Sequence, residues 1–159
     1  MKNNKGFSLV ELIVVIAIMA ILAAVAIPTF ATFIKRANVA SDVSFVNDLT
    51  YSAELAHAAT ADKVKDVKVE LNADGTIKLA TYDVYASDGT TKKGSVKITV
   101  ANGKGAAAVE AEQGYSLDKD DAQTAADTID WSYKFKSEKN GIYWIDPADA
   151  KALTGGSTN

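Results

Sequence analysis

Apolar residues run almost without interruption from Phe7 to Ile34, and Glu11 is the only ionisable residue among them. The stretch from Leu12 to Ile34 holds about 23 residues, which at about 1.5 Å per residue make a helix of about 35 Å, enough to cross a hydrocarbon core of about 30 Å. A carboxylate in such a segment is costly in lipid, so Glu11 requires a partner that the segment does not contain. The pattern predicts a membrane-spanning helix with a functional carboxylate.

After Lys35 and Arg36 the all-apolar pattern becomes amphipathic, which predicts that one long helix continues to about Ala61. One face follows the three-and-four spacing of a buried stripe: Val39, Val43, Val46, Leu49, Ala53 and Ala56. Polar residues are expected largely on the other faces: Asn38, Ser41, Asp42, Asn47, Asp48 and Glu54. This second half of the helix needs the rest of the chain as its partner.

Pro28 lies inside the helical pattern, where it removes a backbone hydrogen bond and clashes with the preceding turn. We therefore expect a kink, or a locally melted stretch, between Val25 and Pro28. Small alanines at 17, 20, 23, 24 and 26 allow apolar helices to approach one another closely.

The remainder of the chain has the alternation and turn residues of β-hairpins. We predict one hairpin from 67–71 and 77–85 around the turn 72–75, and a second from 96–100 and 107–111 around 102–105. A final hairpin is predicted from Trp131, Tyr133 and Phe135, a turn at 139–141, and 142–145. Residues 118–128 are expected to be a loop or a short helix, and 155–159 to fray. An antiparallel sheet packed on the long helix, an α+β fold, accommodates these elements.

Composition narrows the function. About 100 of the 159 residues remain for one compact domain once the apolar half of the helix is set aside. The net charge of −3 argues against binding nucleic acid by neutralising phosphates. The chain has no cysteine, which removes disulfides and thiolate chemistry.

The start of the chain resembles the leader and helix start of type IV prepilins and pseudopilins. The resemblance rests on the uninterrupted run Lys5-Gly6-Phe7-Ser8-Leu9-Val10-Glu11-Leu12-Ile13-Val14-Val15-Ile16. It implies that a membrane peptidase cuts between Gly6 and Phe7, that Phe7 becomes the N-methylated amino terminus, and that Glu11 pairs with this amine on a neighbouring subunit during assembly. Loss of Lys2 and Lys5 with the leader makes the net charge −5.

The resemblance also implies the type IV pilin fold and four regions: a leader (1–6), a hydrophobic transmembrane and filament-core helix (7–34), an amphipathic helix (35–61) and an antiparallel β-sheet head (62–159). The expected function is that of a major pilin, without enzymatic activity or a cofactor, that forms an extracellular filament for adhesion, twitching motility and biofilm. The expected partners are other pilin subunits, a prepilin peptidase, a membrane platform and an assembly ATPase. Before assembly the subunit is expected in the cytoplasmic membrane, and afterwards in a filament at the cell surface. In lacking cysteine, the chain resembles the Gram-positive members of the pilin family.

Other interpretations stay open. One alternative is a pseudopilin of a type II secretion or DNA-uptake system, which has the same kind of leader. Another is a membrane-anchored binding domain that does not polymerise. A secretory signal with a cleavage site at Ala24-Val25-Ala26 has a shorter apolar run than this one. A plain signal anchor explains the length and the basic flanks but gives Glu11 no purpose.

Candidate catalytic or ligand-binding residues are few. His57 is the only histidine, and its place on the amphipathic helix favours a packed or solvent-facing side chain over a general base. The run from Gly103 to Ala108 is weakly similar to a dinucleotide loop, but a hairpin turn explains it better. The acidic group Asp118, Asp120 and Asp121 lacks the spacing of a calcium loop, which favours a solvated loop. The aromatic residues Trp131, Tyr133, Phe135 and Trp144 are expected in the core rather than in a ligand platform.

Overall fold

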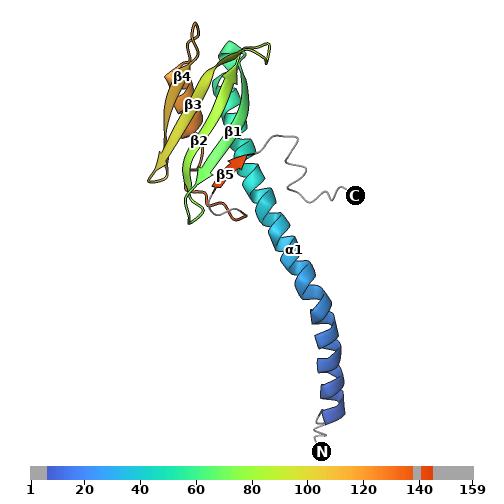
Figure 1. The fold of residues 1–159 in the computed structure, drawn as a ribbon. Helices are drawn as coiled ribbons and strands as arrows, with labels where there is room; N and C mark the ends of the chain where they lie inside the picture. The colour runs from blue at the N-terminus through green and yellow to red at the C-terminus, as the bar shows by residue number, and fades with distance from the viewer. Residues whose placement is uncertain (1–6, 138–140, 145–159) are drawn as a thin grey trace, which may run out of the picture. The chain divides into compact units, whose positions relative to one another are not determined.

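The computed structural model describes residues 7–137 and 141–144 (Figure 1). The chain divides into two compact units, residues 1–37 and 38–159, which we describe separately. The first helix, α1 (Leu9–Ala56), contributes its beginning to the first unit and its end to the second.

The described part of the first unit is helix with its apolar side chains exposed. Between Phe7 and Ile34 the large hydrophobic side chains have exposed fractions from 45% at Val15 and Ile34 to 81% at Phe7. By length and composition alone, α1 is able to cross a membrane, and none of its most apolar stretch is buried. A helix that is apolar on all sides requires lipid or other helices around it.

Pro28 lies within the unbroken α1, and residues 25–28 are α-helical. The locally melted stretch, one of the two alternatives that we expected here, is therefore absent from this structure, and the kink stays a prediction. The hydroxyl groups of Thr29 and Thr32 donate to the carbonyl oxygens of Val25 and Pro28, at 2.9 and 3.1 Å. These bonds satisfy hydroxyl groups that otherwise have no partner in an apolar helix.

The second unit is built on a five-stranded antiparallel sheet in the order β4-β3-β2-β1-β5. Its strands are β1 (Lys63–Leu71), β2 (Ile77–Tyr85), β3 (Lys92–Ala101), β4 (Lys104–Ala111) and β5 (Gly141–Trp144). The first two predicted hairpins are confirmed: Val69 pairs with Ala80 and Ile98 with Ala107. The turn between β3 and β4 has positive φ at Asn102 (52°) and Gly103 (71°), as a two-residue hairpin turn requires.

Two helices cover the same face of the sheet: the part of α1 from residue 38 onward, and α2 (Lys119–Asp127) (Figure 1). Phe45, Val46 and Leu49 of α1 are buried in one hydrophobic core with strand residues such as Tyr82 and Ile98. Each large apolar side chain buried in this way stabilises the fold by about 1.5–3 kcal/mol. Together with the apolar helix, this α+β arrangement is the pilin-like architecture that the sequence predicts.

The α2 helix completes the outer edge of β4. The side-chain oxygen of Gln123 accepts from the Ala107 amide at 2.9 Å, and its nitrogen donates to the Gly105 carbonyl at 3.0 Å. One side chain thus takes the two backbone positions that a further strand would occupy, which protects this edge from pairing with other chains.

The predicted final hairpin is wrong. Residues 131–135 form no strand, apart from one isolated bridge between Thr76 and Lys134, and β5 pairs with β1 instead. The aromatic side chains of this segment turn to the core: Trp131 donates from Nε1 to the Ala126 carbonyl at 2.6 Å, and Phe135 is buried. The expected turn residues 139 and 140 and the expected frayed end at 155–159 lie outside the described residues.

Two details of the amphipathic helix also differ from expectation. The α-helix ends at Ala56, and a short 3-10 turn (Ala58–Thr60) follows before Ala61 takes a left-handed conformation with φ of 55°. Asp42, which we expected on a polar face, is completely buried. The helical spacing places it beside the buried Val39, Phe45 and Val46, three or four residues away.

Candidate functional site

Glu11 lies in the first turn of α1, where the structure adds a reason for its place. The partial positive charge at a helix amino terminus stabilises a carboxylate by about 0.3–1 kcal/mol. The helix begins with a bond from the Leu12 amide to the Ser8 carbonyl at 3.1 Å. Glu11 follows Ser8 by three residues, which is also the spacing of a capping box, a helix-start signal that the sequence reasoning overlooked.

The predicted processing residues lie next to this turn. Phe7 is 81% exposed and lies two residues before Leu9, where α1 begins, whereas Gly6 lies outside the described residues. In the described part of the chain no hydrogen bond or ion pair reaches the Glu11 side chain. Both the carboxylate and the apolar surface around it are therefore available to another molecule.

His57 is packed, as expected, at the end of α1. It is 2% exposed, its Nε2 lies 3.4 Å from the Tyr82 hydroxyl, and burial lowers the pKa of the imidazole below its usual 6.5. Burial likewise raises the pKa of the Tyr82 hydroxyl above its usual value. The site is enclosed by the core and offers a substrate no route to the ring.

The other candidates have structural explanations. The side chain of Asp118 accepts the Asp120 amide at 2.8 Å and so caps the start of α2, where acidic residues are favourable. The glycine-rich run after β3 is the β3–β4 hairpin turn. Trp131 and Phe135 are core residues, and Tyr133 stacks on Phe45 with ring centroids 4.9 Å apart. The side chain of Trp144 is not among those described.

Asp42 is a polar centre that sequence reasoning missed. Its carboxylate accepts the Tyr133 hydroxyl at 2.7 Å, the Lys136 amide at 3.1 Å, and the amide of Ser137 at 2.8 Å as well as the Ser137 hydroxyl. These bonds fasten the segment that leads from α2 to β5 onto α1. Asp42 lies three residues after Val39 and four before Val46, both buried, but nothing in the local sequence identifies the partners that enclose it.

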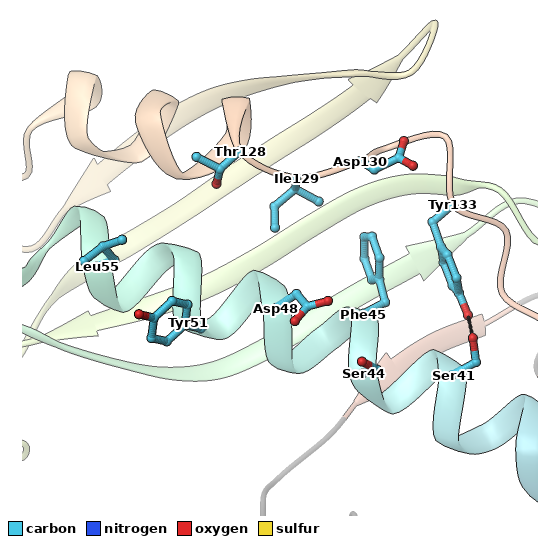
Figure 2. Close-up of a pocket in the computed structure, with 10 residues that line it drawn as sticks. All are labelled: Ser41, Ser44, Phe45, Asp48, Tyr51, Leu55, Thr128, Ile129, Asp130 and Tyr133. Carbon is cyan, nitrogen blue, oxygen red and sulfur yellow. Dashed lines mark hydrogen bonds between the residues drawn. The ribbon is translucent and has the colours of Figure 1, made fainter.

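A groove of about 560 Å³ lies between α1 and the loop 128–133 (Figure 2). Its floor is aromatic, formed by Phe45 and Tyr133, and its rim carries the carboxylates of Asp48 and Asp130. The remaining lining residues are hydroxylated or apolar: Ser41, Ser44, Tyr51, Leu55, Thr128 and Ile129. A hollow of this size and mixed chemistry is suited to binding a few side chains of another molecule.

Comparison with known protein families gives a match at the start of the chain. The family described as the prokaryotic N-terminal methylation motif matches residues 1–27. A comparison with curated proteins gives no match, and neither does one with solved structures.

The match covers the leader, the proposed cleavage position and most of the apolar helix 7–34, as far as Ile27. It supports a type IV pilin or a pseudopilin and implies processing by a prepilin peptidase and assembly with other pilins. The apolar helix fits a membrane-anchored precursor that later enters a surface filament.

Proposed function

We propose that this chain is the major structural subunit of a type IV pilus and polymerises through α1. The observation that carries the proposal is an exposed apolar helix with a single carboxylate, Glu11, in its first turn, within the matched methylation motif. The head then forms the surface of the filament and serves adhesion, surface motility and biofilm. The subunit has no catalytic activity of its own.

Processing creates the charge that assembly uses. Cleavage between Gly6 and Phe7 gives Phe7 a free amine, which stays cationic after methylation. In apolar surroundings this amine and the Glu11 carboxylate of a neighbouring copy neutralise each other. Removing one partner of such a buried pair costs about 3–5 kcal/mol, because the other charge is left unpaired. A subunit in the wrong position therefore fails to add.

The rest of the assembly follows from the same proposal. A prepilin peptidase cuts the leader (1–6), and a membrane platform and an assembly ATPase extract the helix 7–34 from the bilayer into the filament core. The amphipathic part of α1, which ends at Ala56, and the head 62–159 then stay outside the membrane. The absence of cysteine supports a Gram-positive type of pilin.

A pseudopilin of a secretion or DNA-uptake system is the second candidate, because the methylation motif is common to both classes. Neighbouring genes distinguish the two. A retraction ATPase and further pilins beside this gene support the pilus, and a secretion apparatus supports the pseudopilus.

The decisive variant is Glu11→Ala in cells that produce the wild-type filament. We expect the leader to be removed at the normal rate while filaments sheared from the cell surface disappear, because only the assembly partner is lost. Glu54→Ala, another exposed carboxylate of α1, is the matched control and is expected to leave filaments intact. Normal filaments from Glu11→Ala contradict the role of this residue.

Mass spectrometry of the mature protein tests the processing step directly. The expected amino terminus is an N-methylated Phe7. An unmodified chain that begins after Ala26 identifies a secretory signal instead and removes the prepilin interpretation.

A further inference from the structure

The groove between α1 and the loop 128–133 has two carboxylates at its rim, and neither forms an ion pair with a described residue. Asp48 is exposed and has no hydrogen bond or ion pair with any described residue. Asp130 is held in place by the amide and hydroxyl of Ser132, at 3.0 and 2.6 Å, and these bonds lower the pKa of its carboxyl group. Both carboxylates are therefore exposed at the rim of the groove.

The rest of the groove presents apolar and aromatic surface. Tyr51 and Leu55, four residues apart on one ridge of α1, are 69% and 63% exposed. Ile129 faces them from the loop, as Figure 2 shows. Exposed apolar side chains gathered beside two carboxylates favour a ligand that is itself apolar with basic groups.

Lys136 lies near one end of the groove, where its ammonium group makes a cation–π contact with an aromatic ring of the groove floor. Its ammonium group lies 5.9 Å from the centre of the Tyr133 ring and 3.5 Å from the hydroxyl of Ser41. A cation over an aromatic face gains about 0.5–1 kcal/mol at an exposed site. The acidic part of the groove, at Asp48 and Asp130, holds no such cation among the described residues.

One segment of this same chain has the complementary chemistry. Phe30 and Phe33 are 64% and 67% exposed, and Lys35 and Arg36 come after Phe33 with only Ile34 between. Neither basic side chain has a hydrogen bond or ion pair with a described residue. The sequence has no acidic residue between Glu11 and Asp42, so the segment around Phe33 combines apolar side chains with positive charges alone.

We propose that the groove receives the segment 33–36 of a second copy of the chain, with Lys35 and Arg36 against Asp48 and Asp130. Phe33 then covers the exposed ridge of Tyr51. This inference rests on the proposed function, because a polymer brings copies together at high effective concentration. It adds a second contact to that of Glu11, one that joins the head of one subunit to the helix of another. Since donor and acceptor surfaces differ, the contact is heterologous and can repeat without closing, as a filament requires.

Charge exchange tests the contact in cells that assemble the full-length protein. Asp48→Lys and Arg36→Asp each place like charges together, and we expect each to reduce sheared filaments by roughly tenfold relative to the membrane-bound pool. Combining both changes restores opposite charges, so filaments should return to near the wild-type amount. Glu54→Lys makes the same change of charge on α1 outside the groove and should have little effect.

Cross-linking gives a second measurement that leaves every charge in place. The chain has no cysteine, so any disulfide between copies that carry Ala37→Cys and copies that carry Ser44→Cys joins the introduced residues. Ser44 lines the groove, and Ala37 lies one helical turn after Phe33. Copies carrying one or the other, expressed together, should form disulfide-linked dimers in sheared filaments. Asn47→Cys, exposed but outside the groove, replaces Ser44→Cys as the control and should give few dimers.

The outcomes separate the two proposals. The groove contact is overturned if Asp48→Lys combined with Arg36→Asp does not restore filaments and if the Ala37→Cys and Ser44→Cys copies form no specific dimer. The proposed function still stands in that case, provided that wild-type filaments depend on Glu11. A Ser44→Cys variant that links to a different protein assigns the groove to that partner and also overturns the contact. A wild-type protein that forms no filament, in cells whose other pilins assemble, overturns both.

Discussion

Replacing Asp42 by alanine should loosen the segment that leads from α2 to β5. The change removes the acceptor of the Tyr133 hydroxyl, of the amides of Lys136 and Ser137, and of the Ser137 hydroxyl. A buried donor left without its acceptor costs about 1–3 kcal/mol. Lys136 and Ser137 lie near the surface, where water compensates part of this loss. We therefore expect a total cost of about 3 kcal/mol in the free energy of unfolding.

Thermal unfolding of the full-length protein in detergent micelles measures this cost. For a unit of this size a loss of about 3 kcal/mol lowers Tm by about 10 °C. Tryptophan fluorescence follows the transition, because Trp131 is buried in the same core. Asp48→Ala removes an exposed carboxylate from the same helix and should change stability by less than about 0.5 kcal/mol.

Asp42→Asn refines the test. The amide oxygen still accepts the Tyr133 hydroxyl, but the amide nitrogen faces the donors of Lys136 and Ser137. We expect a loss between those of the control and of Asp42→Ala. A loss below about 1 kcal/mol for Asp42→Ala would refute the reasoning, because four donors cannot lose a buried acceptor at so small a cost unless the segment is already loose.

Two further predictions concern the head. Burial lowers the pKa of His57, so below the usual value of 6.5 the unfolded chain binds more protons than the folded chain, and stability should fall as the pH drops from about 7 to about 5.5. The free energy of unfolding in urea should therefore decrease with pH over this range, and His57→Gln should remove this dependence. The same pH dependence in wild type and His57→Gln contradicts the burial effect. Gly105 leaves no room for a side chain, since a Cβ atom there lies 2.6 Å from Nε1 of Trp131. Gly105→Ala should cost about 1–3 kcal/mol by overpacking, seen as a lower urea midpoint, whereas the exposed Ala108→Ser should leave the midpoint nearly unchanged.

The elements that could be predicted are those whose signals are local. Apolar length and the lone Glu11 predict the first half of α1, and alternation with Asn-Gly or Asp-Gly turns predicts β1 to β4. The confirmed hairpins bring together residues close in sequence, such as Ile98 and Ala107. Packing then only has to agree with what the local pattern already favours.

The failures come from contacts between distant residues. Asp42 meets partners 91 to 95 residues later in the chain, and no local pattern shows that a carboxylate on a helix will be enclosed by them. The alternation of Trp131, Tyr133 and Phe135 is the same as that of a strand. There the side chain of Asp130 accepts the Ser132 amide, a local turn that competes with extended pairing, and the aromatic rings pack on Phe45 instead.

The two unusual carboxylates of α1 have opposite environments, and the difference indicates what each one does. Asp42 is buried and fully satisfied by its own chain, so it belongs to the folding of the head and needs no second molecule. Glu11 is surrounded by exposed apolar side chains and has no partner among the described residues. In lipid or in a bundle of apolar helices a lone carboxylate is costly, so we propose that its compensating charge comes from another molecule. A change at Glu11 should accordingly abolish filaments without lowering the Tm of the head, while a change at Asp42 should lower the Tm first and affect filaments only through it.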